Sequence, residues 1–239
     1  MEENEKFDQG TKEEENIEAT SELKEETVNT VKQVKDSVKN VNFKEETKKT
    51  QGLLTELFKN PIVTLKNIAS DNQNHFFKTS LFIFIVWIVI SLIDGICTQF
   101  IGYYGWFVSF RSIGRNFLSL IKITISPIVS VIILSLIVFA MNKKEKKSLT
   151  TILTTVIAIK IPIVLGEILG LLVYISSNAS AITVPFAGLC GVISTILSYF
   201  GIKELLQEKE DGKFIKTFAI IQGIYYLAVF IISFLGIRI

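Results

Sequence analysis

Five long apolar runs dominate the pattern of hydrophobic and polar positions after residue 76. They cover residues 77–98, 116–141, 149–175, 181–200 and 214–236, and each is 20 to 27 residues long. A helix of roughly 20 apolar residues is enough to cross the hydrocarbon core of a bilayer. The runs lack the short alternating segments of a membrane barrel. The pattern therefore predicts an all-α fold, a polytopic membrane helical bundle with five transmembrane helices.

Residues 1–52 precede these runs, and we expect them to form a disordered, polar tail. Residues 1–26 hold eleven Asp or Glu and three Lys, whereas residues 27–50 hold six Lys and three Asp or Glu. The first part buries too little apolar surface to offset the entropy of ordering the chain. Valines recur at helical spacing from Val28 to Val41, which favours either a weak amphipathic helix over residues 27–43 or a disordered linker. The tail either solubilises the chain or docks a partner.

Residues 53–75 are expected to form a juxtamembrane helix at the membrane interface. Asn60 is placed to cap a helix, and Pro61 suits the first helical position because its fixed φ and missing N–H are tolerated there. The expected apolar face of this segment consists of Leu54, Leu57, Phe58, Ile62, Leu65 and Ile68.

The distribution of basic residues predicts the orientation of the chain in a cell membrane. Eleven lysines flank the spans on the side of the N-terminus, and three arginines lie on the other side. Loops rich in Lys and Arg stay in the cytoplasm. We therefore expect a cytoplasmic N-terminus and an outer C-terminus. The whole chain has a 49% hydrophobic fraction, a mean hydropathy of +0.45 and a net charge of only +2.

Polar residues inside the spans form the candidate site. A charged residue at the middle of a span costs about 2.5–3.5 kcal/mol on an insertion scale, so such residues are expected to face protein or water instead of lipid. Similar depths favour pairs between Asp94 and Lys122, between Glu167 and Lys122, and between Lys160 and Gln222. The candidate intramembrane cluster consists of Asp94, Lys122, Lys160, Glu167 and Gln222.

Two interpretations of this cluster stay open. The charges neutralise one another and fix the packing of the bundle, or they line a path or binding site for a solute. Pro162 is expected to kink its helix and free the Ala158 carbonyl for Lys160 or a water molecule. Small residues at four-residue spacing favour close helix packing. These small residues are Gly166, Gly170, Ala187 and Gly191.

Enzymatic, cofactor-binding and nucleic-acid-binding functions have little support in the sequence. His75 is the one histidine, and Asp71 is its nearest acidic neighbour, which is too small a set for a zinc site or a catalytic triad,. Cys97 and Cys190 lie in apolar runs and are interpreted as small buried side chains. No phosphate-binding or dinucleotide-binding glycine motif occurs, and basic and aromatic residues do not combine on a soluble face. We expect no enzyme activity, no cofactor, no metal and no nucleic-acid partner.

The segment "LFKNPIVTLKNIA" resembles the start of bacterial Yip1-domain membrane proteins. The matching positions are Phe58, Asn60, Pro61, Thr64 and Ile68. The five runs and the charged segment before the last one fit the same family over residues 53–236. The resemblance implies a five-helix membrane protein with a cytoplasmic N-terminus. Eukaryotic members act in vesicle trafficking and bind small GTPases, but the acidic motif of those members is absent here.

The sequence therefore leaves two functions open. The first is a non-enzymatic scaffold of Yip1 type, which binds membrane-protein partners or further copies of itself within the lipid bilayer. The second is a small-molecule or ion transporter or channel that uses the charges of spans one, two, three and five. Water access to Lys160 and Glu167 favours transport, whereas a dry and mutually paired set favours the scaffold.

Overall fold

The computed structural model describes residues 24–39, 42–71, 73–101, 113–142 and 147–234. The chain divides into one unit up to Val41 and a second, larger unit of Asn42–Ile239. In the first unit, residues 24–39 form a helix whose Val28, Val31 and Val38 are exposed. The possible helix was expected over residues 27–43, whereas the described helix covers residues 24–39. Residues 1–23 of the expected disordered tail lie outside the described part.

The secondary-structure elements of the second unit, in its described part, are helices, and five of them are long and apolar enough to cross a membrane. This confirms the all-α, five-helix fold predicted from the apolar runs. The candidate spans are Phe77–Gln99, Phe117–Met141, Leu149–Tyr174, Ser180–Leu206 and Asp211–Phe234. They lie in α4 (Phe77–Ile96) with the π-helical η1 (Cys97–Ile101), α5 (Ile113–Met141), α6 (Leu149–Gly170) with the 3₁₀ turn η3 (Leu171–Tyr174), α7 (Ser180–Leu206) and α8 (Asp211–Phe234).

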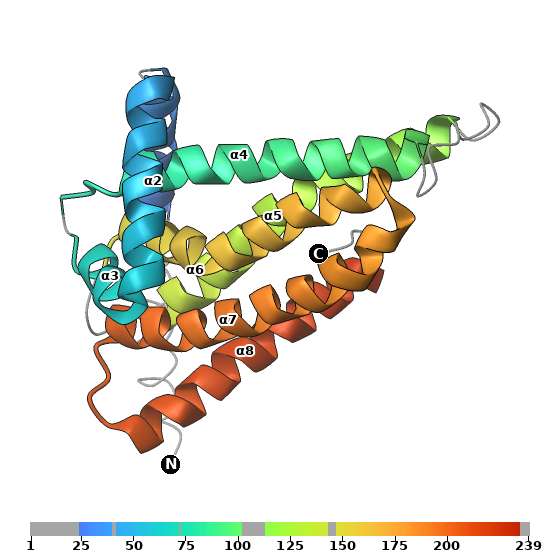
Figure 1. Ribbon diagram of the computed structural model, residues 1–239. Coiled ribbons are helices and arrows are strands. Elements are labelled where there is room, and N and C mark those ends of the chain that lie inside the picture. The colour runs from blue at the N-terminus through green and yellow to red at the C-terminus, as the bar shows by residue number, and fades with distance from the viewer. Residues whose placement is uncertain (1–23, 40–41, 72, 102–112, 143–146, 235–239) are drawn as a thin grey trace, which may run out of the picture. The chain divides into compact units, whose positions relative to one another are not determined.

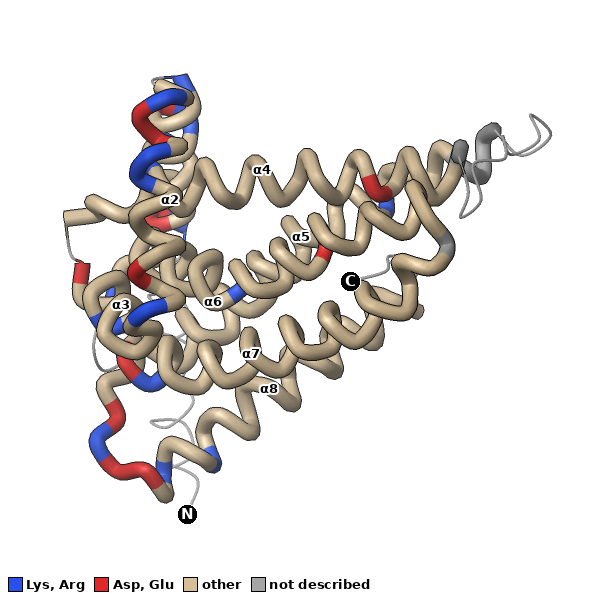
Figure 2. Tube along the Cα trace, in the orientation of Figure 1, with Lys and Arg blue, Asp and Glu red and all other residues tan. Residues whose placement is uncertain are grey.

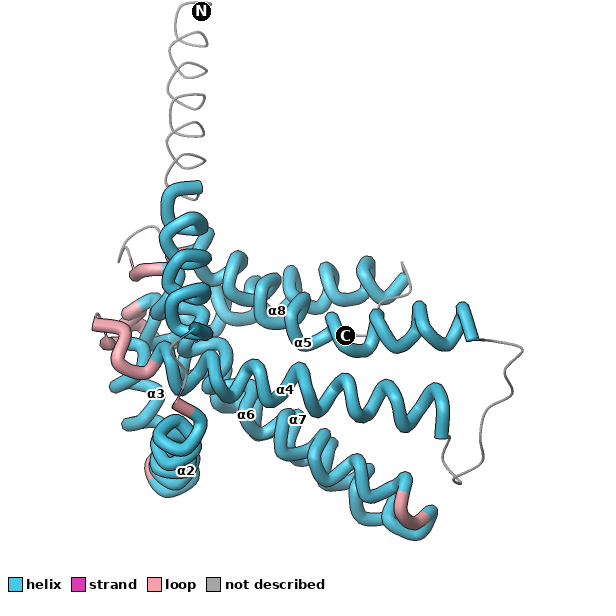
Figure 3. Tube along the Cα trace, turned by 90° about the horizontal axis from the view of Figure 1, so that it is seen from above, coloured by secondary structure: helices cyan, strands magenta, loops and turns pink. Residues whose placement is uncertain are grey.

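Helix α6 is the central helix of this unit. It contacts α4, α5 and α7, and 56% of the most apolar stretch of its span is buried, compared with 11% for α8. Figures 1 and 3 show the five long helices running between two ends of the unit, one marked by α3 and the other by the turn from α6 into α7. We call these the α3 end and the η3 end. The outer helices leave their apolar faces exposed, as lipid-facing helices do,.

Two shorter helices lie at the α3 end. They are α2 (Phe43–Lys59) and α3 (Pro61–Ala69), separated at Asn60. The juxtamembrane helix therefore begins ten residues earlier than the expected residue 53, and it is broken in two. Pro61 does occupy the start of α3, but the Asn60 side chain makes no capping hydrogen bond. In Figure 2 the charged residues of this unit gather around α2, α3 and the turn between α7 and α8.

The buried face of these two helices differs from the expected one in part. Leu57, Leu65 and Ile68 are buried as expected, whereas Phe58 is 59% exposed and Leu53 takes its place in the core. The N-terminal part of α2 also packs on α4. There the hydroxyl of Thr79 donates a hydrogen bond of 3.1 Å to the buried Glu46 carboxylate. Helical spacing alone predicted an apolar face on this segment, but it did not show whether Leu53 or Phe58 belongs to that face.

Helix α7 packs tightly against α6 at Gly201. A Cβ added at Gly201 would lie 2.9 Å from Cγ2 of Ile159 and 3.3 Å from Cγ2 of Thr155. Both neighbours are β-branched, and their χ1 rotation is restricted in a helix. The two helices can therefore keep this distance only with glycine at position 201.

We predict that Gly201→Ala lowers the melting temperature of the detergent-solubilised protein. The extra methyl overpacks the contact, which typically costs about 1–3 kcal/mol. Gly191→Ala is the matched control on the same helix, because an added Cβ there meets no atom within 4 Å. Equal melting temperatures for Gly201→Ala and the unsubstituted protein would show that α6 and α7 do not depend on this close contact.

Asp71 organises the connector between α3 and α4. Its carboxylate accepts hydrogen bonds from the backbone N–H groups of Gln73 (3.1 Å) and Phe76 (3.0 Å), and lies 3.1 Å from Nδ1 of His75. Burial by itself would raise the pKa of Asp71, but the hydrogen bonds from Phe76, His75 and Gln73 outweigh it and lower that pKa below its ordinary value,.

Asp71→Asn is expected to destabilise the protein at neutral pH by about 1–2 kcal/mol, since it removes charge-assisted hydrogen bonds. A lowered pKa in the folded state means that the ionised Asp71 stabilises the fold above the ordinary aspartate pKa of about 3.9. That contribution is lost as the pH falls through the lower, folded-state value. Melting curves of both proteins between pH 7 and pH 2.5 should therefore converge at the acidic end. A constant difference over that range would contradict the assignment.

Candidate functional site

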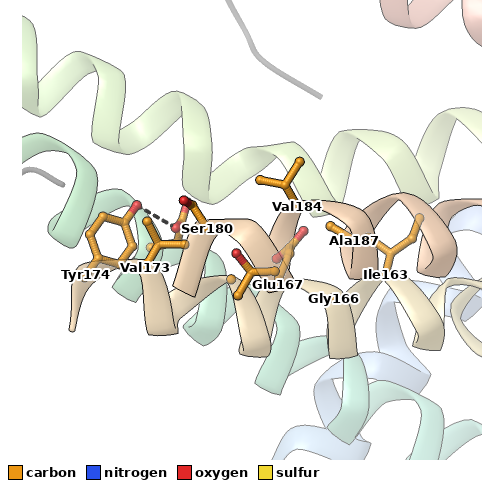
Figure 4. A pocket seen from close by; sticks show the side chains of 11 residues that line it. Ile163, Gly166, Glu167, Val173, Tyr174, Ser180, Val184 and Ala187 are labelled. Carbon is orange, nitrogen blue, oxygen red and sulfur yellow. Dashed lines mark hydrogen bonds between the residues drawn. The ribbon is translucent and has the colours of Figure 1, made fainter. Parts of the chain in front are cut away.

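Two of the five predicted cluster residues, Asp94 and Glu167, line the same pocket near the η3 end. The pocket has a volume of about 320 Å³ and lies between α4, α6 and α7. In Figure 4, Glu167 lies between Tyr174 at one end of the pocket and Ile163 with Ala187 at the other. The lining residues are Asp94, Ile163, Gly166, Glu167, Gly170, Val173, Tyr174, Ser180, Thr183, Val184 and Ala187.

Helix α4 supplies the donors that hold Glu167. The indole Nε1–H of Trp87 donates a hydrogen bond of 2.9 Å to Oε2 of Glu167, and the hydroxyl of Ser91 donates one of 3.0 Å to the same oxygen. Within the described part of the chain, the second oxygen of Glu167, Oε1, accepts no hydrogen bond. This half-buried carboxylate therefore keeps one oxygen for a ligand.

A side chain of η3 donates a hydrogen bond to Asp94 in a similar way. The hydroxyl of Tyr174 donates a hydrogen bond of 2.9 Å to Oδ1 of Asp94. Thr98 also contacts this hydroxyl, and because a phenol has a single proton, Thr98 must be the donor in that second bond,. Oδ2 of Asp94 has no hydrogen-bond donor among the residues that the structure describes. Each of the two carboxylates thus has one oxygen engaged by the protein and one available.

The expected charge pairs do not form. Among the described side chains, no lysine or arginine forms an ion pair with Asp94 or Glu167. Lys122 is half-buried on α5, without an ion pair to either acid. The pairs of Asp94 and of Glu167 with Lys122, which similar depths favoured, are therefore absent among the described side chains. Depth along the membrane does not fix which way each side chain points around its helix.

Lys160 makes a separate polar contact, without an acidic partner among the described side chains. It is buried, and its Nζ donates a hydrogen bond of 3.3 Å to the hydroxyl of Tyr225 on α8. The same Nζ lies 4.9 Å from the centre of the Tyr225 ring, and the Tyr225 hydroxyl bonds to Ser130 at 2.7 Å. The predicted partner Gln222 is half-buried on α8 and makes no hydrogen bond to Lys160. Lys160 therefore belongs to the packing between α5, α6 and α8.

Pro162 lies inside a helix that continues to Gly170, so it does not end α6. We expected the freed Ala158 carbonyl to accept a hydrogen bond from Lys160 or from a water molecule, and Lys160 bonds to Tyr225. The hydroxyl of Ser194 on α7 donates a hydrogen bond of 2.8 Å to the neighbouring Ile159 carbonyl. This bond does not replace the one that Pro162 removes, because the N–H missing at Pro162 would bond to the Ala158 carbonyl and not to that of Ile159.

The small residues divide into two pairs. A Cβ added at Gly166 would lie 3.3 Å from Cβ of Cys190 and 3.5 Å from Cα of Ala187, so these residues form a close α6–α7 contact. A Cβ added at Gly170 or Gly191 would meet no atom within 4 Å. Gly170 instead borders the pocket. Helix packing therefore explains Gly166 and Ala187, whereas the four-residue spacing wrongly assigned it to Gly170 and Gly191.

Sequence reasoning missed the residues that hold the carboxylates, although a signal was present. Trp87, Ser91, Asp94 and Thr98 follow one another at three- and four-residue steps, which places them on one face of a helix,. Glu167 and Tyr174 are seven residues apart and share a face in the same way. The predicted cluster consists of four charged residues and Gln222, so it leaves out this polar stripe, which is composed mostly of neutral side chains.

The comparisons with known proteins give no family for this chain. No family model, no curated protein and no solved structure matched it. The resemblance to Yip1-domain proteins stays a prediction. In the structure, its motif residues Thr64 and Ile68 are buried in α3, Asn60 and Pro61 form the junction of α2 and α3, and Phe58 is exposed.

Proposed function

We propose that this protein is a membrane transporter or channel for a cationic solute, which binds between α4, α6 and α7. The observation that supports it most is the pair of carboxylates on one pocket, each with one available oxygen and without a basic partner among the described residues. Unpaired acids within a membrane span carry a free-energy cost, and they usually mark a substrate or ion pathway. A cation entering the pocket would remove that cost.

The distribution of lysines supports an orientation with the N-terminus in the cytoplasm,. In that orientation the η3 end faces the outside, and Asp94 and Glu167 lie in the outer half of the membrane. A solute would then reach the carboxylates from the outer side. Transport further requires a second state in which the pocket opens toward the α3 end.

The Yip1-type scaffold remains the second candidate, and one observation favours it. Phe58, Ile62 and Val63 are 59%, 46% and 58% exposed on the junction of α2 and α3. An exposed apolar group of this kind suits a membrane interface or a partner protein. This surface lies at the α3 end, so substitutions there separate the two functions.

Charge displacement in proteoliposomes tests the proposed function. Purified protein would be adsorbed on a solid-supported membrane and exposed to rapid steps of sodium, potassium, calcium, methylammonium and hexylammonium chloride. We expect at least one cation to displace charge, and we expect Asp94→Asn and Glu167→Gln to weaken its apparent affinity about tenfold or more.

Lys122→Met is the matched control, because it removes a half-buried charge from a neighbouring span without touching the pocket. It should leave the apparent affinity unchanged, as should Phe58→Ser at the α3 end. Absence of a signal with every cation, or an unchanged signal in the Asp94→Asn, Glu167→Gln double variant, would contradict the proposal.

A further inference from the structure

We infer that the solute is an organic cation with an apolar body, such as a protonated alkylamine, and not a bare metal ion. The inference rests on the proposed function and deepens it. It follows from the distribution of polar and apolar side chains around the pocket, from the pocket volume and from the position of Gly170.

The pocket is lined by carboxylates and by aliphatic side chains, and we call the aliphatic ones the aliphatic wall. Asp94 and Glu167 provide the carboxylates, whereas Ile163, Val173 and Val184 provide aliphatic side chains. A hard metal cation such as calcium takes six to eight oxygen ligands and gains nothing from an aliphatic wall. Groups of three or more Asp, Glu, His or Cys suited to a metal do not occur in the described ranges. An ammonium group at the carboxylates, with its alkyl chain against the aliphatic wall, uses both kinds of lining residue.

The size of the pocket also fits an organic solute. Its volume of about 320 Å³ is far larger than an ion requires, and it lies at the lower limit of typical small-molecule sites, about 300–1,000 Å³. Gly170 contributes to this space, because a side chain added there would meet no protein atom within 4 Å. The empty space beside Gly170 is therefore available to the body of a ligand.

The position of Val184 indicates how such a ligand arrives. Val184 lines the pocket and is also 67% exposed on the surface of α7. In a membrane, that surface of α7 contacts lipid. An amphiphilic amine concentrates at the lipid surface, and it can enter the pocket from the side of α7 with its ammonium group directed at Glu167.

The protein contains a suitable reporter. The sequence has two tryptophans, Trp87 and Trp106. In a Trp106→Phe background, emission would come from Trp87 alone, whose indole N–H bonds directly to Glu167. A cation that binds the free oxygen of Glu167 changes the charge felt by this indole and shifts its emission. Titrations in nanodiscs would use methylamine, butylamine, hexylamine, hexanol, sodium chloride and calcium chloride.

We expect the affinity to rise about fourfold for each methylene buried, up to the chain length that fills the pocket. Hexanol, which has the same chain without the charge, should bind more weakly, and its binding should not change with Glu167→Gln.

Gly170→Val should weaken hexylamine binding about tenfold or more and leave methylamine binding unchanged. Gly191→Val is the matched control on α7, where an added Cβ also meets no atom, outside the pocket. Signals from empty nanodiscs would be subtracted to remove partitioning into lipid.

The outcomes separate this inference from the proposed function. If sodium or calcium shifts Trp87 emission through Asp94 and Glu167 while alkylamines do not, the organic-cation inference is wrong and a cation pathway stands. If Gly170→Val and Gly191→Val weaken hexylamine equally, the aliphatic wall does not select the solute, and the inference is wrong in the same way. If no cation produces a response that depends on the carboxylates, both proposals are wrong.

Discussion

The hydrogen bonds from Trp87 and Ser91 to Glu167 are the contacts on which the rest of the site depends. A carboxylate between membrane helices needs donors, because hydrocarbon offers none. Both donors come from α4 and both reach one oxygen of Glu167, at 2.9 and 3.0 Å. This fixes the rotation of α6 against α4, and it leaves the second oxygen directed at no protein donor among the described residues. The same arrangement holds at Asp94, with Tyr174 as donor, so the pocket is lined by two carboxylates.

Helix α6 carries two charged side chains in different surroundings. Lys160 is buried against Tyr225, which in turn bonds to Ser130, so this contact holds α5, α6 and α8 together. Glu167 lies seven residues further along, about 10 Å away on an α-helix, and it faces a pocket. A charge that the fold buries completely resembles a structural element, whereas a charge that borders open volume resembles a binding element. Packing therefore accounts for Lys160, whereas a binding role for Asp94 and Glu167 is the proposal.

The long apolar runs made the five helices predictable, because burial in lipid requires only length and composition. The side-chain partners were not predictable in the same way. Spacing placed Lys160 and Glu167 on one helix face, but crossing helices meet that face at different heights, so one reaches α8 and the other α4. The polar stripe of α4 and η1 was visible in the sequence from the spacing of Trp87, Ser91 and Thr98. The role of Ser194 at the Ile159 carbonyl was not, since it depends on which helix packs beside Pro162.

The central claim, that this pocket attracts cations, is tested most directly by the rate of thiol modification at position 170. Gly170→Cys and the control Gly191→Cys would be made in a Cys97→Ala, Cys190→Ala background, because an added side chain at either glycine meets no atom within 4 Å. Each would react with a cationic and an anionic methanethiosulfonate of similar size. The account predicts that the cationic reagent reacts about tenfold or more faster at position 170. This preference should disappear after Asp94→Asn and Glu167→Gln and should be absent at position 191. Equal rates for the two reagents at position 170 would contradict it.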